Sequence, residues 1–175
     1  MDLLSHALWG ATIVRKRHLV WWAALFGALP DLVGSAPGFL YLLFARGILW
    51  GTDTWQLMPA WTHDAYHLSH SLLGIAVVAV TLACVGKWHA RTTDTVRSGG
   101  WLILILPFSF HIVLDLFTHV TDPLARLLFP FVAWDAAHVI GVNWWESGWI
   151  IATNIATLIL MNAFLWRRWR FPTPV

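Results

Sequence analysis

Three side chains that can bind a metal ion recur at regular spacing between Pro107 and His119, inside a long apolar run. His111, Asp115 and His119 lie four positions apart in turn, so on a helix they fall along one stripe. An ionisable stripe at membrane depth is energetically costly and usually marks a functional site. Two imidazoles and a carboxylate are ligands that a zinc-type ion prefers. The spacing therefore predicts a metal site on this helix, with a polar packing seam between helices as the alternative interpretation.

The composition places the chain among membrane proteins. Its 175 residues are 58% hydrophobic and 11% charged, whereas a soluble domain usually carries about 25% charged residues. The 14 tryptophans suit the membrane–water interface, where an amphipathic ring is stable. The net charge is only +2 and the basic residues form short clusters, which favours contact with the headgroups of membrane lipid over nucleic-acid binding. We expect residues 1–175 to form a single membrane-embedded domain.

Apolar runs of different lengths predict the elements that must position these ligands. Three runs are long enough to span a bilayer as helices, at residues 61–85, 99–120 and 144–166. The other expected segments are helices at 2–14 and 18–29, a loop at 34–38, an interfacial or re-entrant helix at 39–50 and interfacial helices within 121–143. The pattern predicts an all-α integral membrane protein. We expect a compact bundle of about four to five transmembrane or half-membrane helices, with interfacial helices in addition.

Three basic clusters give the bundle an orientation. They lie at residues 15–17, 87–97 and 167–170. The positive-inside rule places all three on the cytoplasmic side, and the three predicted spans allow this if they run inward, outward and inward again. The C-terminus is therefore expected in the cytoplasm.

Distance from this basic belt predicts that several ligand-type residues meet. At 1.5 Å per helical residue, five of them lie between about 14 and 27 Å from the belt. They are His6, Asp31, His70, His111 and Asp115. That level is the outer half of the membrane, so we expect one site there. His63 and His67 share a helix face with His70, and whether these two and His119 are also ligands is left open by the pattern.

Motifs along the whole chain carry a resemblance to a known family. They are Ser5-His6-Ala7-Leu8 with Gly10-Ala11, Leu29-Pro30-Asp31, Ser69-His70-Ser71, His111-x-x-Leu114-Asp115-x-x-Thr118 and Phe129-Pro130-Phe131. With them the chain resembles the small bacterial membrane-bound metal-dependent hydrolases of the YdjM type. The resemblance implies the bacterial inner (cytoplasmic) membrane and a metal site. Two positions depart from the family pattern: Val33 replaces its second acid after Pro-Asp, and Ala65-Tyr66-His67 replaces its His-Arg-Gly. His63 or His67 could supply the missing ligand.

The order of the ligands is also similar to that of the zinc-dependent phospholipase C and single-strand nuclease group. That group is all-helical with a multi-zinc phosphodiesterase site, which would imply that Asp115 bridges two ions. The predicted metal ligands are His6, Asp31, His67, His70, His111, Asp115 and His119. The predicted catalytic residues among them are His70, His111 and Asp115. The predicted cofactor is a divalent transition metal of the zinc type, as one or two ions.

The predicted function is hydrolysis of a phosphoester by metal-activated water. A phospholipid or lipid-linked substrate at the outer leaflet suits the depth of the site, and a soluble phosphoester is the alternative. Two other classes fit the same residues: a metal or proton transporter, and a non-catalytic metal-binding membrane protein. The cytoplasmic halves of two spans, residues 75–85 and 99–107, contain almost no ionisable side chain, which argues against a path through the membrane. The oligomeric state is not encoded in these patterns.

Overall fold

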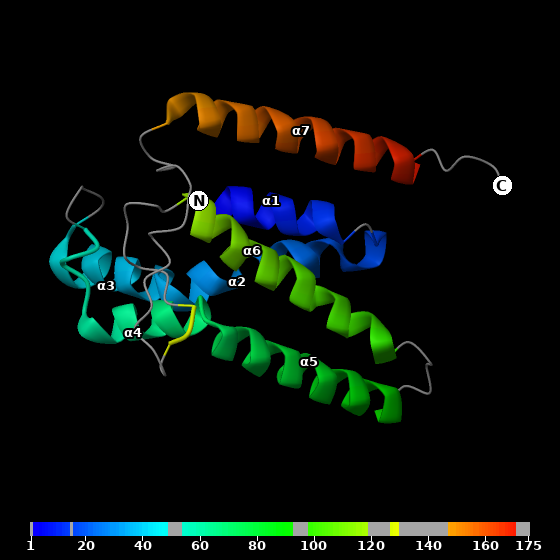
Figure 1. Ribbon diagram of the computed structural model, residues 1–175, viewed down its shortest axis with the longest axis horizontal. Helices are drawn as coiled ribbons and strands as arrows, with labels where there is room; N and C mark the ends of the chain where they lie inside the picture. The colour runs from blue at the N-terminus through cyan, green and yellow to red at the C-terminus, as the bar shows by residue number, and fades with distance from the viewer. Residues whose placement is uncertain are drawn as a thin grey trace.

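The computed structural model in Figure 1 describes residues 2–14, 16–48, 54–92, 98–118, 127–129 and 147–170. Every regular element in these residues is a helix. They are α1 (Leu3–Ile13), η1 (Arg17–Leu19), α2 (Val20–Gly34), α3 (Ala36–Arg46), α4 (Ala60–Ser69), α5 (Leu72–Thr92), η2 (Ser98–Leu104), α6 (Ile105–Thr118) and α7 (Gly148–Arg170). The all-helical prediction is therefore confirmed for the described part of the chain.

Several of these helices have the length and composition of membrane spans. Among the described residues, three segments are long and apolar enough to cross a membrane: Leu72–Arg91, Gly100–Thr118 and Gly148–Arg167. The pair Arg17–Gly34 and Ala36–Arg46 passes the same test together but is bent by 51°, and Leu3–Ile13 is a shorter apolar helix. Counting the bent pair as one span raises the number to four. The short helix expected at 39–50 corresponds to α3, and the half-membrane or re-entrant placement of α1 and α3 stays a prediction.

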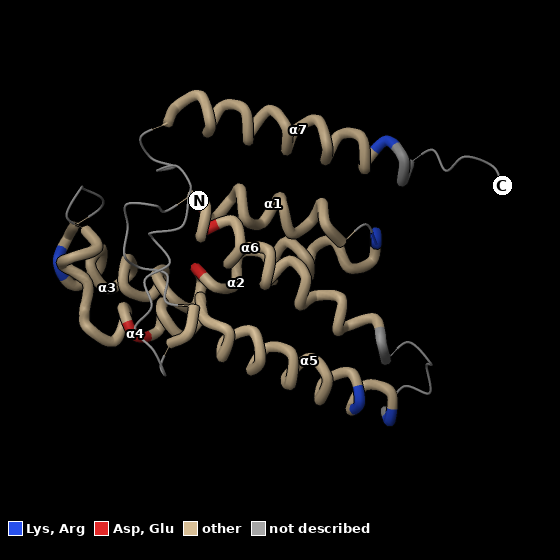
Figure 2. The backbone as a smooth tube through the Cα atoms, in the orientation of Figure 1, with Lys and Arg blue, Asp and Glu red and all other residues tan. Residues whose placement is uncertain are grey.

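The helices form a bundle in which α1 and α2 are central. Helix α1 contacts α2, α6 and α7, and α2 also contacts α3, α4 and α6. Figure 1 shows α7 along one side of the bundle and α5 along the opposite side. In Figure 2 most basic positions gather at one end, at the α1–α2 connection and the ends of α5 and α7, while acidic positions lie away from that end. The charge separation expected from the sequence is present, and the side of the membrane that it faces stays a prediction.

Helices α1 and α2 approach so closely that two glycines are required at their crossing. A Cβ atom on Gly10 would lie 2.3 Å from the carbonyl oxygen of Ala23, and one on Gly27 would lie 2.5 Å from that of His6. Both oxygens belong to backbone that cannot move aside, so larger residues would force the helices apart. Small residues at helix crossings are common in membrane proteins for this reason. The crossing holds the His6 turn of α1 directly against α2.

The expected end of the second helix at Pro30 is wrong. Helix α2 continues through Pro30 to Gly34, and only Ser35 separates it from α3, so most of the loop expected at 34–38 is helical. Proline inside a helix removes one backbone donor and distorts the turn, but such helices persist where other donors satisfy the freed groups. Pro37 lies in the first turn of α3, where its missing N–H costs nothing. The chain therefore bends between two helices instead of leaving the bundle.

The single span expected at residues 61–85 is also wrong, because a break at His70 divides it into α4 and α5. Two serine hydroxyls replace the helical hydrogen-bond pattern there. Ser69 Oγ donates to the carbonyl of Tyr66 at 3.0 Å, and Ser71 Oγ donates to that of Leu68 at 2.7 Å. Ser71 Oγ also accepts from the Gly74 amide at 3.1 Å, as a helix N-cap does. These contacts end α4 and start α5 in a new direction.

The remaining expected segments agree more closely with the structure. The span expected at 99–120 corresponds to η2 and α6, which end at Thr118 within the described residues. The last expected span begins later than residue 144, at Gly148, and forms α7. Most of the region 121–143, where interfacial helices are expected, lies outside the described residues. In the turn at 127–129, the Leu127 carbonyl accepts a hydrogen bond from the Leu72 amide at 2.8 Å. This bond connects the turn to the start of α5.

Apolar side chains pack into a core at the basic end of the bundle. Its buried members come from α1, η1, α2, α5 and η2 and their connections: Val14, Leu19, Ala23, Leu82 and Leu104. Trp101 and Phe26 pack against them. Among the described residues, the buried histidine and acidic side chains lie elsewhere: His6 on α1, His67 on α4, His70 at the α4–α5 break, and His111 and Asp115 on α6.

Candidate metal centre

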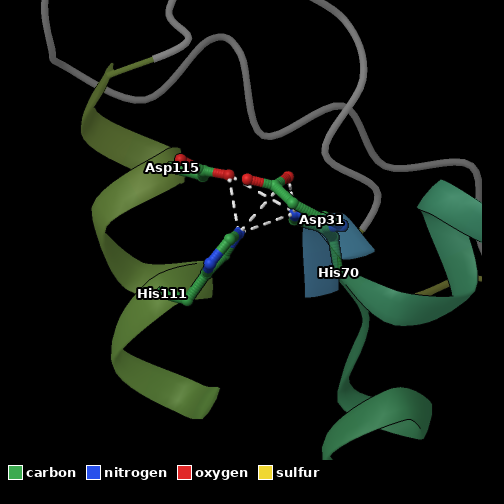
Figure 3. Close-up of side chains that lie close together, drawn as sticks. All are labelled: Asp31, His70, His111 and Asp115. Atoms are coloured by element: carbon green, nitrogen blue, oxygen red, sulfur yellow. Dashed lines mark hydrogen bonds and ion pairs between the residues drawn. The ribbon is translucent and has the colours of Figure 1, made fainter. Parts of the chain in front are cut away.

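Four ionisable side chains from three separate parts of the chain meet in the bundle (Figure 3). Asp31 comes from α2, His70 from the break between α4 and α5, and His111 and Asp115 from successive turns of α6. One ligand atom from each lies within 4.8 Å of the others. His70, His111 and Asp115 are buried, and the Asp31 side chain is 16% exposed. The convergence expected from helix depth is thus present for these four, and the cluster could bind a metal ion.

The distances among the four side chains fit a tetrahedral ion. His70 Nε2 and His111 Nε2 are 3.0 Å apart, and Asp115 Oδ2 lies 3.4 and 3.2 Å from them respectively. Asp31 Oδ1 lies 3.6 Å from His70 Nε2 and 3.7 Å from His111 Nε2. Four ligands bound tetrahedrally at about 2.0–2.1 Å are separated from one another by about 3.3–3.4 Å. The observed separations bracket this value, so the side chains could bind such an ion with only small movements.

Backbone carbonyls fix which nitrogen each imidazole turns toward the cluster. His111 Nδ1 lies 2.6 Å from the Gly27 carbonyl, and His70 Nδ1 lies 3.0 Å from the Tyr66 carbonyl. A carbonyl oxygen can only accept, so an Nδ1 atom that bonds to one donates and carries the proton. Ser69 Oγ, 3.0 Å from His70 Nδ1, donates to the same Tyr66 carbonyl. In neutral rings the two Nε2 lone pairs then point at each other across 3.0 Å. That arrangement is repulsive unless a positive charge lies between the rings, and a carbonyl behind each imidazole is typical support for a metal ligand.

Both carbonyls lie beside an irregularity in a helix. Pro30 lies inside α2 and cannot donate to the carbonyl of Phe26, which precedes Gly27. The Gly27 carbonyl accepts the proton of His111 Nδ1. The Tyr66 carbonyl, in the last turn of α4, also accepts the His70 amide and the Ser69 hydroxyl, each at 3.0 Å. A carbonyl oxygen has two lone pairs, so it can accept from an imidazole in addition to a helical partner.

His6 lies beside the four-residue cluster and is linked to it through Asp115. Its Nε2 is 2.9 Å from Asp115 Oδ1, while Asp115 Oδ2 faces His70 and His111. The His6 ring stacks on that of His111, with centroids 3.5 Å apart and the planes 22° from parallel. His6 is 1% exposed, and its Nδ1 has no hydrogen-bond partner among the described residues. It therefore differs from His70 and His111, whose Nδ1 atoms are held by carbonyls.

The other predicted ligands do not join the cluster in the described part of the chain. His67 is buried, but its ring faces that of Phe129, with centroids 5.8 Å apart. His63 is half-buried and packs edge-on against Trp55 at 4.5 Å. His119 lies outside the described residues. The structure thus brings together five of the seven predicted ligands, and ligation by any of them stays a prediction.

Two residues that support the cluster were not predicted from the sequence. Gly27 supplies the carbonyl behind His111 and permits the close crossing of α1. Tyr66 supplies the carbonyl behind His70, and its ring stacks on the His70 ring with centroids 3.9 Å apart. Tyr66 stands where the resembling family has arginine. A signal existed for Tyr66, which precedes His70 by one helical turn, the spacing at which helical side chains stack.

The comparisons with known proteins do not assign the chain. No family model, no curated protein and no solved structure matches it. The resemblance drawn from the motifs therefore stays a prediction, and the functional argument depends on the residues of the cluster.

Proposed function

We propose that the chain is a membrane-embedded metal-dependent hydrolase that cleaves a phosphoester, in a phospholipid or lipid-linked substrate of the outer leaflet. One observation carries the proposal. His70 and His111 direct their Nε2 atoms at each other across 3.0 Å, with both Nδ1 atoms bonded to backbone carbonyls and two carboxylates alongside. A divalent ion of the zinc type satisfies all four side chains at once.

The residues of the cluster fall into two groups with different tasks in this proposal. His70, His111 and Asp115 hold the ion, because they are buried and mutually closest. An ion held there would make hydroxide available at neutral pH and polarise a phosphoryl oxygen. Asp115 Oδ1 and His6 Nε2 form the next pair, 2.9 Å apart. This pair could exchange a proton with the reacting water or provide two ligands to a second ion.

The position of the cluster supports a lipid-borne substrate. Asp31 lies near the end of α2 that is farther from the basic α1–α2 connection, which the positive-inside rule assigns to the cytoplasm. Beside the cluster, α6 exposes apolar side chains on another face: Leu106, Val113 and Phe117. Such a face suits acyl chains, while the cluster suits the charged headgroup. A phosphoester with a lipid tail would be anchored so that its head reaches the metal.

The alternative of a transporter is opposed by the packing of the basic end. The buried apolar core around Leu82 and Leu104 lies at that end, and none of the ionisable side chains buried in the described residues lies on η1, α5 or η2. An ion or proton would have to cross this core without such a ligand, at high energetic cost. A site accessible from one side suits an enzyme better than a transporter.

The test begins with metal content and continues to hydrolysis. Protein purified without a histidine tag and supplemented with zinc should contain about one or two ions per chain. It should release phosphate or a headgroup from lipid phosphoesters in nanodiscs, and lose this activity to a chelator until zinc is restored. Less than about 0.2 equivalents of any transition metal would favour a non-catalytic protein. Metal uptake into vesicles without hydrolysis would favour a transporter, and hydrolysis of a soluble phosphoester alone would exclude the lipid substrate.

A further inference from the structure

Asp31 differs from the other members of the cluster in both exposure and distance. Its side chain is 16% exposed, whereas those of His70, His111 and Asp115 are 2% exposed or less. Its oxygen lies 3.6 and 3.7 Å from the two imidazoles, whereas the other three ligand atoms lie 3.0–3.4 Å from one another. Asp31 is therefore the outermost and least tightly placed ligand.

The contacts of the two carboxylates show the same contrast. Asp115 makes close contacts with His6, His70 and His111. Among the described residues, the ion pairs of the Asp31 carboxylate are those with the two imidazoles, at 3.6 and 3.7 Å. Its backbone is well held, because the Asp31 carbonyl accepts from both the amide and the hydroxyl of Ser35, at 3.0 and 3.1 Å. The main chain at Asp31 is thus fixed, while the side chain could rotate away at little cost.

A hydrolytic metal site needs such a ligand. Four protein ligands make a closed site of the structural type, whereas catalytic zinc keeps three protein ligands and leaves one position for water or substrate. His70, His111 and Asp115 already form a buried three-ligand face. The fourth position lies on the side of Asp31, the most exposed of the four side chains.

We propose that Asp31 is an exchangeable ligand, which occupies the fourth position at rest and gives it up to an oxygen of an incoming phosphate group. This inference rests on the proposed metal centre. The exchange replaces one anionic oxygen by another, so it requires no oxidant, reductant or additional proton. It also defines the route of entry, since the phosphate must approach along the exposed side of Asp31.

Cobalt-loaded protein provides the test, because the visible absorption of Co²⁺ reports the ligands of the ion directly. The variant Asp31→Ala should retain cobalt at the wild-type stoichiometry, with affinity lowered by about tenfold or less, whereas His111→Ala should lose it. Inorganic phosphate should alter the cobalt spectrum of both wild-type and Asp31→Ala protein, with at least about tenfold tighter binding to the variant. Imidazole, a neutral ligand, should also bind the variant more tightly. Tighter imidazole binding would show that the variant has an open coordination position, because the loss of a negative charge alone would not favour a neutral ligand.

The matched control is Asp64→Ala, which removes an exposed carboxylate from α4 and should leave metal and phosphate binding unchanged. If Asp31→Ala loses cobalt as His111→Ala does, Asp31 is a permanent ligand and the inference is wrong while the metal centre stands. The same holds if phosphate and imidazole bind the variant no more tightly than the wild type. If wild-type protein binds neither cobalt nor zinc, the proposed function itself fails, and this inference fails with it.

Discussion

The two ends of the helical bundle are built on opposite principles. At the basic end, side chains such as Leu82 and Leu104 fill an apolar core. At the other end the helices are interrupted, with a 51° bend after Asp31 and a break at His70, and buried polar groups replace the apolar core. The interruptions therefore coincide with the ligands instead of being spread along the bundle.

This difference shows how an apolar bundle can hold ionisable side chains. A buried imidazole needs a hydrogen-bond partner, and a backbone carbonyl can provide one because its oxygen has two lone pairs. The Gly27 carbonyl, shortly before Pro30, and the Tyr66 carbonyl, one turn before the break at His70, each orient one imidazole. Substitutions at the two ends should accordingly have separable effects.

The largest effect is expected from Asp115→Ala at the ligand end. The Asp115 carboxylate lies within 2.9–3.4 Å of three imidazoles, those of His6, His70 and His111, so its removal leaves them without a shared anionic partner. Bound metal and hydrolysis should both be abolished, while the protein still inserts into the membrane. Metal analysis and the lipid phosphoester assay measure the loss, and membrane fractionation measures insertion.

His89→Ala is the matched control for this substitution. His89 lies on α5 near the basic end, where its ring is 6.3 Å from that of Trp101. It should retain metal and activity close to wild type. If His89→Ala is as damaging as Asp115→Ala, the assignment of the site is wrong.

The next largest effect is expected from Leu82→Ala at the apolar end. Leu82 is 4% exposed within the core of that end, and truncating a buried leucine typically costs about 2–5 kcal/mol of stability. The thermal midpoint should fall, while metal content per folded chain stays unchanged. Val80→Ala removes a 63% exposed side chain from the same helix and should barely change the midpoint. Loss of metal from folded Leu82→Ala protein would show that the two ends are not independent.

The helical class and the long apolar segments could be predicted from the sequence, because the length of an apolar run decides whether a helix can span a bilayer. The two interruptions could not be predicted in the same way. Pro30 was expected to end a helix but lies inside one, whereas His70 was expected inside a helix but ends one. At each interruption one hydrogen-bond partner is distant in the sequence: the Gly27 carbonyl accepts from His111, and the Leu72 amide donates to the Leu127 carbonyl. A local pattern does not contain such partners.

The meeting of the ligand-type residues was predictable because their distances from the basic belt give a common level. His67 shows where that reasoning stops. It shares a face with His70 only if the helix continues, and the break at His70 turns the two rings toward different neighbours, Phe129 and His111. The role of Gly27 was not predictable, because it depends on a backbone carbonyl that every residue carries.

Gly27→Ala should affect both stability and metal binding, because Gly27 lies at the α1–α2 crossing and its carbonyl orients His111. The added Cβ would lie 2.5 Å from the His6 carbonyl, so α1 and α2 must both move apart, and overpacking of this kind costs about 1–3 kcal/mol. The shift also moves the carbonyl that holds His111, and zinc affinity should fall about 10–100-fold. Thermal unfolding and a zinc competition titration measure the two effects.

Gly100→Ala is the control, since a Cβ at Gly100 meets nothing within 4 Å. It should leave both measurements close to wild type. A Gly27→Ala protein that is destabilised but binds zinc normally would show that the Gly27 carbonyl does not orient a ligand.

The smallest effect is expected from Asn154→Leu, on the helix that lies at the side of the bundle. Asn154 donates to Ser5 Oγ at 3.0 Å and accepts from Trp9 Nε1 at 2.8 Å, which links α7 to α1. Hydrogen bonds between membrane helices contribute about 0.6 kcal/mol each, so stability should fall by about 1 kcal/mol and zinc affinity should not change. Thr153→Val is the control, because the hydroxyl of Thr153 bonds within the described residues to Trp149 of its own helix. If Asn154→Leu lost much of its zinc and Thr153→Val did not, α7 would also help to position the ligands. It would do so through Ser5, which immediately precedes His6.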